Sequence, residues 1–148
     1  MAEGSKLILA SVAAAILVFA GSTAANADRP LPGSYEITTA TTYHDVPLPD
    51  TTLTTTSCLT AEDLARDPAG ALASLPDGQT CSVEESLMAG GVIDMRVTCG
   101  AADGRMAMVT SGTYDPNGWD MVSDVTVTVG SEEVKMHATI QGRRLGDC

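Results

Sequence analysis

The motifs of several common enzyme classes are absent from this chain. It has no glycine-rich phosphate loop, no zincin motif and no nucleophile elbow. Basic residues are also scarce, with 8 Lys and Arg against 19 Asp and Glu, so the formal net charge is −11. Such a surface repels phosphate backbones and anionic lipids, and we therefore expect binding neither to nucleic acid nor to anionic membrane surfaces.

The chain has a single long apolar run, at residues 7–20. Lys6 precedes the run, and small residues with an A-x-A triplet at 25–27 follow it. This pattern is typical of a secretory signal peptide, and the run is short for a membrane span, which takes about 20 apolar residues. We predict a signal peptide over 1–27 and a periplasmic or secreted domain over 28–148, with no stable membrane anchor after cleavage. The alternative is an uncleaved anchor.

Aromatic residues make up only 3% of the chain, and the single Phe lies in the predicted signal peptide. The core of the exported part must therefore be built from Val, Ile, Leu, Met and Ala, with Trp119 and the tyrosines as its largest side chains. The remaining length allows one domain but not two.

Alternation of apolar and polar residues dominates from residue 35 onward, as expected for half-buried antiparallel strands. In 134–141 every even position is apolar, and in 119–129 one face collects Trp119, Met121, Val125, Val127 and Val129. We predict a mainly β domain, an antiparallel up-and-down meander of about seven strands that forms a half-barrel or barrel-like sheet.

One short helical insertion interrupts the strands. Thr60 and Asp63 have the spacing of a capping box, and residues 76–78 are expected to end the segment. Pro68 and Gly70 favour two short turns over one continuous helix. The apolar face comprises Leu64, Ala71, Leu72 and Leu75.

All four cysteines lie in the exported part, where an even count indicates two disulfides with three possible connectivities. Folding the segment 81–99 about Gly90 places Cys81 opposite Cys99, close enough for a bridge. The same register pairs Val83 with Val97, Leu87 with Ile93 and Glu84 with Arg96. We predict Cys81–Cys99 and, by elimination, Cys58–Cys148. Zinc is the alternative, disfavoured because the cysteines are scattered.

Two further hairpins are expected near the C-terminus. Residues 115–118 form a turn that places Tyr114 opposite Trp119. A calcium loop is the alternative for this segment, but the turn accounts for all its residues. The second hairpin joins the last two strands and sets Val129 against Val134.

Three segments stand out as motifs: Leu-Pro-Gly-Ser-Tyr-Glu-Ile at 31–37, Cys-Leu-Thr with Glu and Asp at 58–63, and Gly-Arg-Arg-Leu-Gly-Asp-Cys at 142–148. In this order they resemble the motifs of an uncharacterised bacterial family, domain of unknown function 3617, with Tyr35 where that family usually has Trp. The resemblance implies an exported or periplasmic β-rich domain and brings no activity with it.

Few residues suggest catalysis or metal binding. His44 has Asp45 beside it, and a hydrolase-like enzyme using His44 is one alternative, although His44 and His137 are more simply explained as exposed side chains. A soft-metal site of methionines is another alternative. Five of the six downstream methionines, all but Met88, fall on the predicted inward faces, where they fill a core. We therefore predict no cofactor and no metal.

The possible functional surface comprises Arg143, Arg144 and His44. The two consecutive arginines either bind an anion together, or one of them covers the end of the sheet while the other faces solvent.

The chain is thus predicted to be an exported, non-enzymatic domain. An inward face of Met, Val and Gly leaves room for a small apolar ligand, and an envelope protein is the other expected partner. A purely structural or envelope-stress domain is the remaining alternative.

Overall fold

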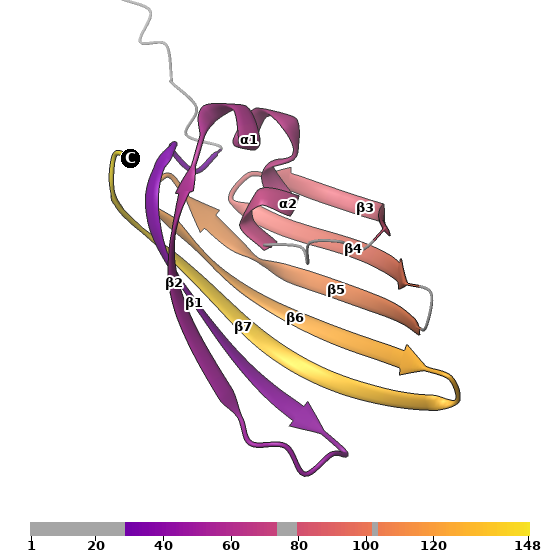
Figure 1. Cartoon of the computed structure of the whole chain (residues 1–148). Helices are drawn as coiled ribbons and strands as arrows, with labels where there is room; N and C mark the ends of the chain where they lie inside the picture. The colour runs from indigo at the N-terminus through magenta and orange to yellow at the C-terminus, as the bar shows by residue number, and fades with distance from the viewer. Residues whose placement is uncertain (1–28, 74–79, 102–103) are drawn as a thin grey trace, which may run out of the picture.

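The computed structural model describes residues 29–73, 80–101 and 104–148, which form one curved sheet and two short helices (Figure 1). The predicted signal peptide, Leu75 and the turn at 76–78 lie outside these residues. The strands are β1 (Gly33–His44), β2 (Thr51–Leu59), β3 (Thr80–Ala89), β4 (Val92–Ala101), β5 (Gly104–Asp115), β6 (Gly118–Val129) and β7 (Glu132–Gly146). The helices are α1 (Ala61–Arg66) and α2 (Pro68–Ala73). No helix in the described residues is long and apolar enough to cross a membrane.

The seven strands form a single sheet in the order β2-β1-β7-β6-β5-β4-β3, and every neighbouring pair is antiparallel. The predicted meander and half-barrel are confirmed. β1 pairs with β7, as the first and last strands of a closed up-and-down barrel do, and the opening lies between β2 and β3. These two edge strands run in the same direction, so a tight hairpin cannot join them and a helical crossover does.

The crossover covers one end of the concave face of the sheet (Figure 1). Leu64 of α1 and Leu72 of α2 are buried there against a core that includes Tyr35, Ile93 and Trp119. The capping box of Thr60 is present, and the helix is split in two before Pro68. Both features agree with the sequence-based expectation.

Two large side chains of this core lie on glycines of neighbouring strands. A Cβ added at Gly142 would lie 2.2 Å from the Trp119 indole, and one at Gly112 would lie 2.7 Å from the Cα of Met121. The Tyr35 and Trp119 rings, 4.8 Å apart between centroids, complete this layer. Glycine is thus required at both positions, because a Cβ at Gly142 would overlap the Trp119 ring and one at Gly112 would overlap the backbone of Asp120 and Met121.

The predicted hairpin at Gly90 is partly wrong. Cys81 does face Cys99, with Cα atoms 4.0 Å apart, and both predicted disulfides are present. A bulge between Val83 and Glu85 then shifts the register, and the turn is Gly90-Gly91 with positive φ at both residues. The pairs beyond the bulge are therefore Glu85 with Arg96, Leu87 with Asp94, and Met88 with Ile93.

The bulge also corrects the expectation for Met88. This side chain faces inward and packs against the core, while Leu87 is 53% exposed. In the last hairpin the predicted register is wrong by two residues, because Val134 pairs with Val127. The Tyr114–Trp119 pair is confirmed.

The two disulfides should contribute unequally to stability. Their sequence separations are 90 residues for Cys58–Cys148 and 18 for Cys81–Cys99. In the chain-entropy model these loops correspond to about 4.6 and about 3.2 kcal/mol. We expect the Cys58→Ser/Cys148→Ser variant to unfold at lower denaturant than the Cys81→Ser/Cys99→Ser variant, measured by urea unfolding without reductant. The opposite order would contradict the expectation.

Candidate functional site

Beyond the helices, the concave face continues as a surface of apolar side chains that no described segment covers. The alternation that buries Met121 of β6 and Ile140 of β7 continues along both strands, and the next inward apolar side chains are only half-buried. On the β2 edge, Leu53 is 63% exposed. We call the following six side chains the open concave surface: Tyr43, Leu53, Val125, Val127, Val134 and Met136.

Polar groups lie on the concave face next to this surface. Thr110 and Ser123 are each 1% exposed, and their hydroxyl oxygens are 2.9 Å apart. One hydrogen bond uses one of the two hydroxyl hydrogens, so the other is left to donate elsewhere. Trp119, also 1% exposed, has no partner for its Nε1–H in the described part of the chain. Buried donors without partners are rare and mark places where a water or a ligand acceptor can bind.

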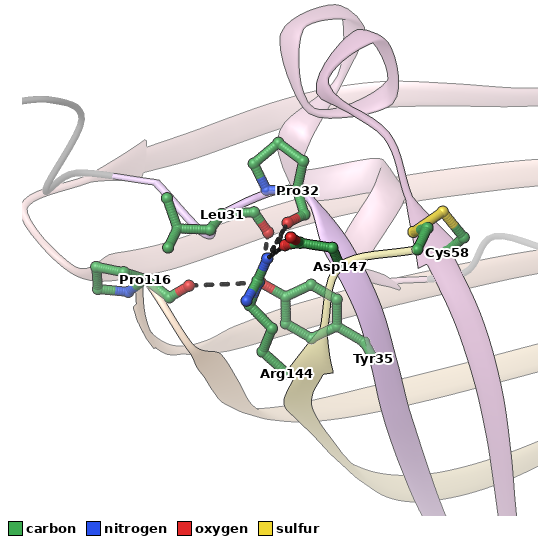
Figure 2. Close-up of polar contacts among 8 residues, drawn as sticks. Leu31, Pro32, Tyr35, Cys58, Pro116, Arg144 and Asp147 are labelled. Atoms are coloured by element: carbon green, nitrogen blue, oxygen red, sulfur yellow. Dashed lines mark hydrogen bonds and ion pairs between the residues drawn. A yellow bond between two sulfur atoms is a disulfide. The ribbon is translucent and has the colours of Figure 1, made fainter.

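The three sequence motifs meet at the covered end of the sheet (Figure 2). The Tyr35 hydroxyl donates to the carbonyl of Leu31 at 2.6 Å, and the Leu31 N–H donates to the carbonyl of Pro116 at 3.0 Å. Burial is the main reason why the pKa of Tyr35 is raised. The disulfide between Cys58 and Cys148 joins the second motif to the third beside this contact.

Arg144 and Arg143 have different structural roles. The Arg144 guanidinium is largely covered, donates to the carbonyl of Pro32 at 2.8 and 3.1 Å, and forms an ion pair with Asp147. Arg143 lies on the outer face and donates to both carboxylate oxygens of Asp120, at 2.9 and 3.1 Å. The two side chains therefore do not converge on one anion. This geometry agrees with the interpretation that one Arg covers the end of the sheet.

Neither histidine lies in a triad geometry in the described residues. His44 ends β1 far from the arginines, since its Cα partner on β7 is Lys135. His137 Nδ1 is 2.8 Å from a carboxylate oxygen of Asp124 on the outer face. The Thr42 hydroxyl donates to the backbone carbonyl of His137 and not to its ring. The structure thus does not gather Arg143, Arg144 and His44 into one site, and no metal-binding cluster of three acidic, His or Cys side chains occurs in the described ranges.

Comparison with protein families gives one result. A family model described as protein of unknown function (DUF3617) matches residues 30–148. The chain belongs to the DUF3617 family. No curated protein and no solved structure matches the chain significantly.

In this DUF3617 domain, the motif residues hold the end of the sheet, and the open concave surface is made by other residues. The sequence indicated the inward faces of β6 and β7 but not the Thr110–Ser123 pair, which lies on β5 and β6. The signal was available, because Ser123 occupies an inward position between Met121 and Val125. What the sequence did not show is which part of the inward face the helices cover.

The Tyr35 contact of the DUF3617 domain should be visible in the pH dependence of stability. Because burial raises the pKa of Tyr35 in the folded state, its stabilising contribution is present below the unfolded value of about 10 and is lost as pH rises through the folded value. We expect Tyr35→Phe to cost about 1 kcal/mol at neutral pH and to remove this alkaline loss, measured by urea unfolding across pH.

Tyr43→Phe is the control, because the structure gives the Tyr43 hydroxyl no hydrogen bond within the described residues. Equal pH profiles for the two variants would contradict the assignment to Tyr35.

Proposed function

We propose that this DUF3617 protein is an exported, non-enzymatic domain that binds a small, mostly apolar ligand on the open concave surface. The observation that carries the proposal is the partial cover of the concave face. Val125, Val134 and Met136 continue the core beyond the helices, yet no described segment packs over them. Neighbouring apolar side chains that remain partly accessible in this way are a feature of binding sites in soluble proteins.

A small ligand fits this surface better than a flat protein face does. The sheet is curved, so a ligand on its concave side contacts several strands at once (Figure 1). Ligand sites are typically apolar with a few polar groups that fix orientation. The Thr110–Ser123 hydroxyl pair and the Trp119 indole N–H provide donors toward the covered end. We therefore expect the ligand to carry a hydrogen-bond acceptor at one end.

Export is supported by the two disulfides, since such bonds persist in oxidising compartments. A non-enzymatic role is supported by the separate positions of the two histidines, because acid–base or nucleophilic catalysis depends on the mutual geometry of the reacting groups. An envelope protein is the alternative occupant of the same surface. A purely structural domain would leave the surface empty.

The proposal is tested by titration with the neutral fluorescent probe N-phenyl-1-naphthylamine. We expect saturable binding that Val125→Asn weakens about tenfold, because burying that side chain against the ligand is worth about 1.5 kcal/mol. The matched control is Val122→Asn on the same strand, since Val122 is 42% exposed on the outer face. It should leave probe affinity unchanged.

Two outcomes would overturn the ligand proposal. One is the absence of saturable probe binding to the folded protein, which favours the structural role. The other is equal weakening by Val125→Asn and Val122→Asn, which would place the probe away from the concave face.

A further inference from the structure

The two edges of the sheet differ in how they are protected against pairing with another strand. Natural sheets protect exposed edges with charges, proline, bulges or short strands. β3 carries Glu84 and Glu85 and contains the bulge at that point. β2 has none of these features, because Thr51–Leu59 contains no charged residue and no proline and its pairing with β1 runs without a register shift.

The β2 edge is also accessible. All eight residues from 51 to 58 are exposed, and β2 is the last strand on its side of the sheet. Figure 1 shows the crossover leaving from the end of β2 and passing over the concave face. Near that end the C-terminal Cys148 is bonded to Cys58, so the accessible part of the edge is residues 51–57. Five of the nine residues of β2 are threonine, a β-branched residue that favours strands. Threonines also pair across strands, as the 3.1 Å contact between the Thr38 and Thr54 hydroxyls shows.

The Asp and Glu residues within the β1–β2 hairpin are its only fully charged side chains, while Arg143 and Lys135 of β7 lie on the other side of β1. The hairpin from residue 33 to residue 59 contains Glu36, Asp45 and Asp50 and no Lys or Arg. None of the three carboxylates forms an ion pair with another described residue. Glu36 points outward from β1 opposite Thr56, and Asp50 directly precedes β2. A second copy of the chain would bring the same negative charges together.

We propose that β2 accepts an added strand, an extended Lys- or Arg-bearing segment of another protein. The backbone groups on the free edge would supply the hydrogen bonds, as in other complexes formed by strand addition. The neighbouring carboxylates select a basic segment and disfavour self-pairing. This interface uses the free backbone groups of β2, whereas the open concave surface takes only the Leu53 side chain from that strand, so strand addition does not depend on the ligand proposal.

The proposal is tested with a synthetic ten-residue peptide of alternating threonine and lysine, which is about as long as β2. A peptide of the same length with alternating threonine and glutamate is its counterpart. We expect the lysine peptide to bind, to slow amide exchange in β2 but not in β3, and to bind at least about tenfold more weakly at about 1 M salt than at about 10 mM. The glutamate peptide should not bind.

Thr56→Lys tests the position of the interface. It places a cation opposite Glu36 on the β2 edge, and should reduce lysine-peptide binding by at least about tenfold. The matched control is Ser82→Lys, which adds the same charge at an exposed position of the β3 edge and should not change affinity. Both variants should keep the circular dichroism spectrum and the urea unfolding midpoint of the unmodified protein, which shows that they are folded.

Three results would overturn the proposal. These are no binding of the lysine peptide, equal effects of the two lysine variants, or protection of β3 in place of β2. A dimer that strengthens as salt rises, with β2 protected in it, would assign the edge to a second copy of the chain and also overturn it.

Discussion

The parallel directions of the two edge strands constrain the rest of this structure. β2 and β3 are the edge strands on the two sides of the opening, and they run in the same direction. A tight turn therefore cannot join them. The chain instead crosses the concave face through α1 and α2. That crossover buries one end of the face, leaves the other end open, and keeps both edges of the sheet unpaired. The partial core, the open concave surface and the free edge of β2 all follow from it.

The pairing of β1 with β7 is the second requirement, because it joins the first hairpin to the meander of β3 to β7. The motif residues reinforce this junction at the covered end. Tyr35 fixes the segment before β1, Arg144 binds the carbonyl of Pro32, and the disulfide from Cys58 ties β2 to the C-terminus. The Arg144 contact and the disulfide join residues 112 and 90 positions apart, whereas the Tyr35 hydrogen bond to Leu31 is local. Together they hold the junction of β1, β2 and β7.

Polar and apolar groups are distributed differently over the two faces and the β2 edge of the sheet. The outer face carries paired charges, such as Arg143 with Asp120 and His137 with Asp124. The concave face carries the apolar core, the buried Thr110–Ser123 pair, the indole N–H of Trp119 and inward threonines of β1 and β2 such as Thr39 and Thr55. The β2 edge is uncharged, and the β1–β2 hairpin to which it belongs carries carboxylates but no Lys or Arg. A small apolar ligand and an extended basic strand would therefore bind at different places on the same domain.

The sequence by itself determined the features that depend on neighbouring residues. Alternation identified the strands, the turn at 115–118 aligned Tyr114 with Trp119, and the spacing of Thr60 and Asp63 identified the capped helix. The Cys81–Cys99 disulfide could also be predicted from the sequence, because its two strands are joined by a short turn. Even there the bulge after Val83 was missed, because Leu87 and Met88 are both apolar and alternation alone did not decide which of them faces inward.

Only the tertiary structure decided which strands meet across long separations. The pairing of β1 with β7 and the position of the opening depend on the packing of the whole sheet, and no short stretch of sequence encodes them. For the same reason, alternation showed that Val125 and Met136 face inward but not that the helices stop short of them. Burial of an inward side chain depends on what crosses above it, and that is a property of the complete fold.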